Sequence, residues 1–154
     1  MNTKIENKKS KGFTLVELIV VIGVLAILAV AAVVGFQGIQ ANARRATLSA
    51  EANMTASVLN NFNAVATAPV AGENGRVTAA NINAADGAAF IELVVPAQGA
   101  MQVMTFRVDF DNAARRDVVL SYIDFVPGAA GAAGRFVVNT AAIQASDGIA
   151  IRGA

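Results

Sequence analysis

The chain of 154 residues contains no cysteine and no histidine, and these two absences remove several classes of chemistry. Without cysteine there can be no disulfide framework and no thiolate ligand for a metal ion. Without histidine the chain lacks the commonest metal ligand and the commonest general base. Lysine does not occur beyond residue 11, so Ser-His, Cys-His and Ser-Lys catalysis are excluded from there on. We therefore expect no enzyme activity and no cofactor.

Carboxylates are the one remaining class of catalytic or metal-binding group. Asp109, Asp111 and Asp117 lie close together in the sequence and suggest calcium. An EF-hand loop, however, requires an oxygen ligand where Ala113 stands and a glycine where Ala114 stands. We interpret the aspartates as a charged outer sheet face and expect no metal site. The arginines expected to pair with them are Arg107, Arg115 and Arg116.

The net charge of +1 implies no strongly basic surface for nucleic acid, so no nucleic-acid partner is required. The charge is nevertheless uneven, because four of the twelve basic residues, but one of the eleven acidic residues, precede Gly12. A basic N-terminal segment followed by a slightly acidic body is typical of a chain that is targeted to a membrane with the basic segment on the inner side.

Proline is scarce, and none of the three occurs before Pro69. Residues 13–36 are almost wholly apolar, with Thr14 and Glu17 as the clearly polar members, and about 20 such residues suffice to cross a bilayer as a helix. Three interpretations are open. The run is a buried core helix, a secretory signal removed at Ala29-Val30-Ala31, or a retained membrane helix in which Glu17 has a function.

Glu17 is the feature that separates these interpretations. A carboxylate at the centre of a membrane helix costs roughly 2.5–3.5 kcal/mol, and near the edge it still requires a cationic partner. Lys11 is one candidate. If the chain is cut after Gly12, the new ammonium group of Phe13 is another, and the two charges would neutralise each other best between neighbouring helices.

The stretch Gly12-Phe13-Thr14-Leu15-Val16-Glu17-Leu18, behind a short basic leader, resembles the class III signal of type IV prepilins and related pseudopilins. The resemblance covers roughly the first third of the chain. It implies that a prepilin peptidase cleaves between Gly12 and Phe13 and methylates the Phe13 amine. It also implies that Glu17 aligns each incoming subunit with its neighbour.

The partners that this resemblance implies are identical or homologous pilin subunits in a helical homopolymer, the prepilin peptidase, the inner-membrane assembly machinery, and membrane lipid before assembly. Two features depart from the family. Val34 occupies the place where many pilins have a proline, and the C-terminal disulfide of many pilins is impossible here.

A second apolar pattern indicates that the helix continues beyond residue 37. Leu48, Thr55, Leu59 and Phe62 recur at three- and four-residue spacing, joined by Ala52, Val58 and Val65. Thr67-Ala68-Pro69 is a plausible stop. A helix over residues 14–66 would be roughly 80 Å long. We expect a removed leader at 1–12, a membrane or filament-core helix at 13–36, an amphipathic helix at 37–67 and a globular head at 68–154.

The head is expected to be a small antiparallel sheet, which makes the fold α+β. Thr78 is predicted to cap a short helix over residues 79–85, and residues 112–116 to form a loop. Strands are expected at 101–111 and 117–126, paired as a hairpin, and at 90–95, 135–140 and 148–152. Arg44 and Arg45 either solvate a helix face or pair with acids on a neighbouring subunit.

The sequence thus predicts a structural subunit, a pilin, of a type IV pilus-like filament. It would be a single-pass membrane precursor with its head outside, and then part of an extracellular pilus or a periplasmic pseudopilus. Two alternatives stay open. One is a pseudopilin of a type II secretion-like system. The other is a membrane-anchored binding domain that never polymerises and keeps residues 1–12.

Overall fold

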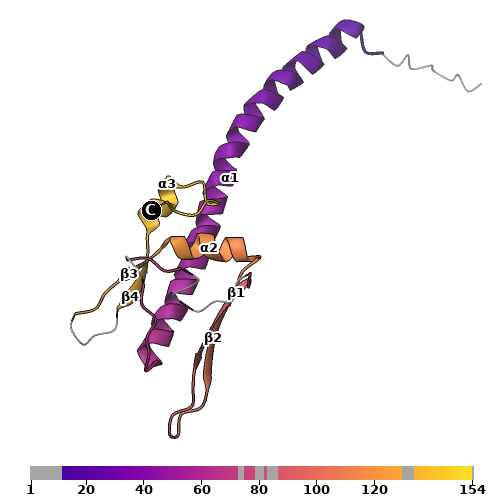
Figure 1. Cartoon of the computed structure of the whole chain (residues 1–154). Helices are drawn as coiled ribbons and strands as arrows, with labels where there is room; N and C mark the ends of the chain where they lie inside the picture. The colour runs from indigo at the N-terminus through magenta and orange to yellow at the C-terminus, as the bar shows by residue number, and fades with distance from the viewer. Residues whose placement is uncertain (1–11, 73–74, 79–81, 83–86, 130–133, 154) are drawn as a thin grey trace, which may run out of the picture. The chain divides into compact units, whose positions relative to one another are not determined.

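The computed structural model describes residues 12–72, 75–78, 82, 87–129 and 134–153 (Figure 1). The chain divides into two compact units, Met1–Ile39 and Gln40–Ala154. Helix α1 runs over Leu15–Val65 and contributes to both units. The helix predicted over residues 14–66 is therefore confirmed to within one residue at each end.

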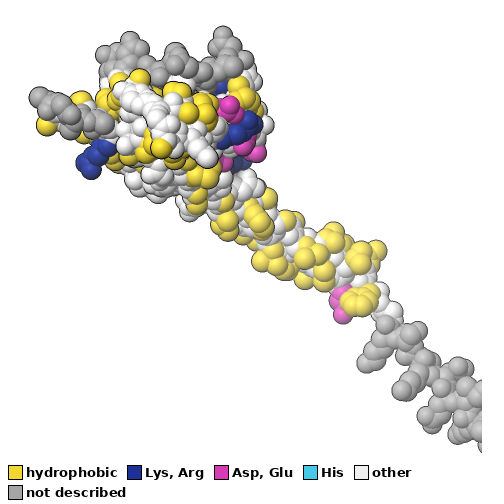
Figure 2. Space-filling model, turned by 90° about the horizontal axis from the view of Figure 1, so that it is seen from below, with side chains coloured by type: hydrophobic (Ala, Val, Ile, Leu, Met, Phe, Trp, Pro, Cys, Tyr) yellow, Lys and Arg dark blue, Asp and Glu magenta, His cyan; other side chains and the backbone are white. Residues whose placement is uncertain are grey.

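In the first unit the large apolar side chains of helix α1 are exposed. All those described between Leu15 and Ile39 are at least half exposed, and Figure 2 shows apolar side chains along this part of the helix. An 18-residue window of α1 reaches a mean hydropathy of 3.1 with none of its residues buried, enough by length and composition to cross a membrane. A helix that is apolar on all faces requires lipid or other helices around it.

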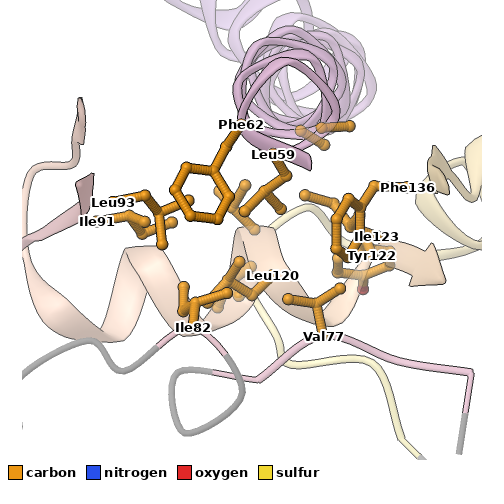
Figure 3. Close-up of a cluster of buried hydrophobic side chains, with 14 of the residues drawn as sticks. Leu59, Phe62, Val77, Ile82, Ile91, Leu93, Leu120, Tyr122, Ile123 and Phe136 are labelled. Carbon is orange, nitrogen blue, oxygen red and sulfur yellow. The ribbon is translucent and has the colours of Figure 1, made fainter. Parts of the chain in front are cut away.

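The second unit has one hydrophobic core, built on the other part of α1. Leu48, Ala52, Thr55, Leu59 and Phe62 are buried, which confirms the stripe expected at three- and four-residue spacing. The stripe is narrower than expected, because Val58 is half-buried and Val65 is exposed. Against it pack side chains from the rest of the unit (Figure 3), among them Ile91, Leu93, Leu120, Tyr122, Ile123 and Phe136.

The described residues of this unit also form two separate two-stranded antiparallel sheets. Strand β1, Phe90–Val95, pairs with β2, Met104–Asp109, so that Val95 lies opposite Met104. Strand β3, Ile123–Val126, pairs with β4, Arg135–Val138, so that Ile123 lies opposite Val138. The strand predicted at 90–95 is confirmed, and the α+β fold class holds.

The predicted pairing of 101–111 with 117–126 is wrong. The partner of β2 is β1, and residues Ala113–Ser121 form helix α2 where a loop and the start of a strand were expected. The helix begins there because Asn112 is its N-cap, accepting a hydrogen bond from the Arg115 backbone N–H at 2.8 Å. The apolar run from Val118 to Leu120 is buried on this helix.

The last part of the chain also differs from the prediction. Strand β4 ends at Val138, and a short helix, α3 (Thr140–Ala145), follows with Asn139 as its N-cap. Residues 148–152 form no strand. The helix expected over residues 79–85, with Thr78 as its cap, lies largely outside the described residues.

Side chains, rather than β-pairing, hold the C-terminal segment 146–153. Four side chains donate hydrogen bonds to carbonyl groups of this segment: Arg45 to Ser146 at 2.8 Å, Arg115 to Gly148 at 2.9 Å, Tyr122 to Ala150 at 3.1 Å, and Arg76 to Arg152 and Gly153 at 3.3 and 2.6 Å. Gly148 has a φ of 78°, and a Cβ there would lie 2.9 Å from the Arg44 backbone. Glycine is required at this position, since both the backbone conformation and the close approach exclude a side chain.

Two asparagines fasten helix α1 to the chain that follows it. The Asn60 amide donates to the Phe136 carbonyl at 2.9 Å and accepts from the Phe136 N–H at 2.8 Å. The Asn63 amide binds both backbone groups of Val70 in the same manner, at 2.8 and 2.9 Å. Asn60 thereby occupies backbone groups of β4 that would otherwise be open to another strand.

Candidate processing and assembly site

The predicted cleavage site lies directly before the first turn of helix α1. Residues 12–14 are non-helical, the helix begins at Leu15, and the Phe13 side chain is 83% exposed. A Cβ added to Gly12 would meet no atom within 4 Å, and its φ is outside the left-handed region. Neither packing nor backbone strain within the described chain explains a glycine at this position.

Thr14 and Glu17 form a capping box at the start of the helix. The Thr14 backbone N–H and its Oγ1 hydroxyl both donate to Oε2 of Glu17 at 2.9 Å. In return the Glu17 backbone N–H donates to Thr14 Oγ1 at 3.2 Å. Each residue therefore satisfies a backbone donor that the first helical turn leaves without an intrahelical partner.

This arrangement gives Glu17 a partner that the sequence interpretation missed, although Thr-x-x-Glu before an apolar run is its signal. Both hydrogen bonds use Oε2, and within the described residues Oε1 of Glu17 accepts none. The carboxylate is thus fixed over the first turn with one oxygen free. Gly12 and Phe13 immediately precede the Thr14 cap, so the three predicted site residues lie within this one stretch; Lys11 lies outside the described residues.

Arg44 and Arg45, expected to act alike, have different environments. Arg45 is half-buried and donates from Nε to the Ser146 carbonyl at 2.8 Å, so the interpretation as a purely solvated face is wrong for this residue. Arg44 is exposed. It lies near Asp147, whose pKa is held below its ordinary value mainly by the N–H groups of Ile149 and Ala150, with a smaller contribution from Arg44.

Two of the three aspartates considered as calcium ligands, Asp109 and Asp117, form ion pairs with arginines. Arg107 binds Asp109 at 2.7 Å and also Glu92, and Arg116 binds Asp117 at 2.8 Å. Arg115, by contrast, does not pair with these aspartates, because it binds Glu51 of α1 at 2.7 Å. Among the residues that the structure describes, no group of three or more acidic side chains is placed to hold a metal ion.

Comparison with known proteins adds one match. Residues 7–33 fit the family model of the prokaryotic N-terminal methylation motif. This stretch contains Gly12, Phe13, Thr14 and Glu17, together with the first turns of the exposed apolar helix. No curated protein and no solved structure matches the chain.

Proposed function

We propose that this chain, a prepilin-like precursor by its N-terminal methylation motif, is the structural subunit of a type IV pilus-like filament. The observation that carries the proposal is the unburied apolar part of α1. It begins beside a capped glutamate, about one turn after the predicted cleavage site. Such a helix can bury its apolar side chains either in lipid or among copies of itself. The same surface therefore serves the membrane precursor and the assembled filament.

Processing would prepare the subunit to pass from the membrane into the filament. The peptidase hydrolyses the bond between Gly12 and Phe13. This bond lies before the helix, whose first hydrogen bond runs from the Leu18 N–H to the Thr14 carbonyl at 3.2 Å. The new Phe13 amine is then methylated and remains positively charged. The chain acts as the peptidase's substrate and has no catalytic role.

Assembly would use the charge left at the helix tip. The Thr14 cap holds the Glu17 carboxylate in one orientation, and its free Oε1 is available to the ammonium group of a neighbouring copy. In an apolar surrounding, opposite charges attract far more strongly than in water. Helix packing and this neutralisation together favour removal of the subunit from the membrane.

The test is to express the chain beside a prepilin peptidase and its assembly machinery, shear the cells, and view the released material by electron microscopy. We expect filaments whose subunit mass corresponds to a chain beginning at N-methylated Phe13. Processed protein that stays in the envelope without surface filaments would favour a secretion pseudopilin. Protein that keeps residues 1–12 and remains in the membrane would contradict the proposal and favour a membrane-anchored binding domain.

A further inference from the structure

The β1–β2 loop, by which we mean residues 93–106 including the adjoining strand ends, exposes several apolar side chains. No residue from Leu93 to Phe106 is charged. The exposed fractions are 59% for Val103, 48% for Val94, 41% for Met101 and 39% for Met104. Sheet edges and hairpins in contact with water usually carry charged residues that prevent association. An uncharged apolar loop of this kind is typical of an interaction surface.

The C-terminal segment exposes a second apolar surface. Ile149 is 54% exposed and Ile151 61% exposed, because the side-chain donors described above fix the backbone of segment 146–153 with these two side chains outward. Beside Ile151 lies a shallow hollow of about 370 Å³. Its lining includes Tyr122, Ala142, Ala145 and Ala150.

These two surfaces cannot meet within one copy. Both belong to the Gln40–Ala154 unit, and Figure 1 shows the β1–β2 loop and the C-terminal segment at opposite ends of that unit. A contact between two different surfaces of identical subunits is heterologous. It repeats from copy to copy and produces an open polymer rather than a closed dimer.

We propose that the β1–β2 loop of one copy packs against Ile149 and Ile151 of the next copy in the filament. This inference rests on the function proposed above. The small size of the two surfaces favours another copy of this chain as the partner. A few apolar side chains expose far less than the roughly 800 Å² per partner of an interface that is stable by itself. The contact therefore forms only when another attachment already concentrates the partner, as bundled N-terminal helices of further copies would do.

The absence of cysteine makes the contact directly testable. Subunits carrying Val103→Cys and subunits carrying Ile151→Cys are produced in the same cells, and the sheared filaments are mildly oxidised. We expect a disulfide-linked dimer of one subunit of each kind. The control replaces Ile151→Cys with Val137→Cys, a 38% exposed valine of β4, and should give several-fold less of the mixed dimer.

The outcomes separate this inference from the proposed function. Filaments that form but yield no more mixed dimer than the Val137→Cys control would overturn the loop contact and leave the filament role intact. If the wild-type chain forms no filaments, both proposals fail. A mixed dimer that also forms in the membrane fraction of cells without assembly machinery would overturn the claim that the contact depends on the filament.

Discussion

Thr14 and Glu17 are joined by three hydrogen bonds across the first turn of helix α1, two of them to the same carboxylate oxygen of Glu17. The glutamate at the edge of the apolar helix is therefore not a stranded charge. It caps the helix within its own chain and keeps a second oxygen free. Capping is thus distinct from the subunit pairing that we propose for the same side chain, and substitutions at the two residues separate them.

Replacing Thr14 tests the capping role alone. Thr14→Val keeps the shape but removes the hydroxyl that donates to Glu17 and accepts from its backbone N–H, whereas Thr14→Ser keeps it. Loss of an N-cap costs about 0.5–2 kcal/mol, so the first turn should open more often in the valine variant. Hydrogen exchange of the Glu17 amide in detergent should be faster in Thr14→Val than in wild type, with Thr14→Ser unchanged. Equal exchange in all three proteins would refute the capping role.

Replacing Gly12 tests the cleavage site. Gly12→Leu should leave uncut precursor in the membrane. No contact among the described residues requires glycine there, so we expect the requirement to lie with the peptidase. Mass spectrometry of the membrane fraction reports the uncut form.

The matched control is Gly23→Leu, because Gly23 also has open space around it but lies inside α1. This variant should be cut normally. Normal processing of Gly12→Leu would show that Gly12 is not required for cleavage.

Much of the N-terminal region could be predicted from sequence because its signals are local. The long helix, its buried stripe and its lack of early proline all follow from spacing along one element. The cap between Thr14 and Glu17 also has a local signal, the Thr-x-x-Glu spacing before an apolar run. Helix α2 differs from the prediction because the apolar run from Val118 to Leu120 resembles a strand, whereas the N-cap Asn112 starts a helix before it.

Non-local contacts could not be predicted in this way. Asn60 looks like an ordinary polar residue on a helix, and its partner Phe136 lies 76 residues away. Nothing in the spacing of either residue indicates the other. For the same reason the sequence does not predict the ion pair between Arg115 and Glu51. Nor does it predict that side chains from several elements bind segment 146–153.

Asn60→Ala should lower the stability of the Gln40–Ala154 unit. It leaves the backbone N–H and carbonyl of Phe136 without their partner, and an unsatisfied buried polar group costs about 1–3 kcal/mol. Denaturant unfolding of the full chain in detergent, followed by the near-ultraviolet signal of Tyr122, measures this loss. The control is Asn53→Ala, because the Asn53 amide is exposed and, in the part of the chain that the structure describes, bonds only to Ser49 of the same helix. Equal stability of the two variants would contradict a stabilising role for the hydrogen bonds between Asn60 and Phe136.

Asp124 should make the stability of the same unit depend on pH. Burial alone would raise its pKa, but hydrogen bonds from Arg152 and Asn139 outweigh this and hold the pKa below the ordinary value of 3.8. A carboxyl with a lowered folded pKa contributes stability above its unfolded pKa and loses it as the pH falls through the folded value. Unfolding free energy should therefore decline as the pH falls below about 4.

Asp124→Asn should flatten that decline, because the variant no longer titrates. Arg152→Gln should flatten it as well, since it removes the charge that lowers the pKa of Asp124. Profiles of unfolding free energy against pH that keep the same slope in both variants would show that other carboxylates cause the decline.

The measurement that tests the central claim most directly is the filament yield of Glu17→Gln as the sole subunit. Glutamine keeps an oxygen that accepts from Thr14 and so preserves the cap, but it carries no charge for the ammonium group of a neighbouring copy. The account predicts normal membrane insertion, normal cleavage at Phe13, and strongly reduced surface filaments. Cleaved Glu17→Gln protein that assembles into wild-type quantities of filament would contradict charge pairing as the basis of assembly.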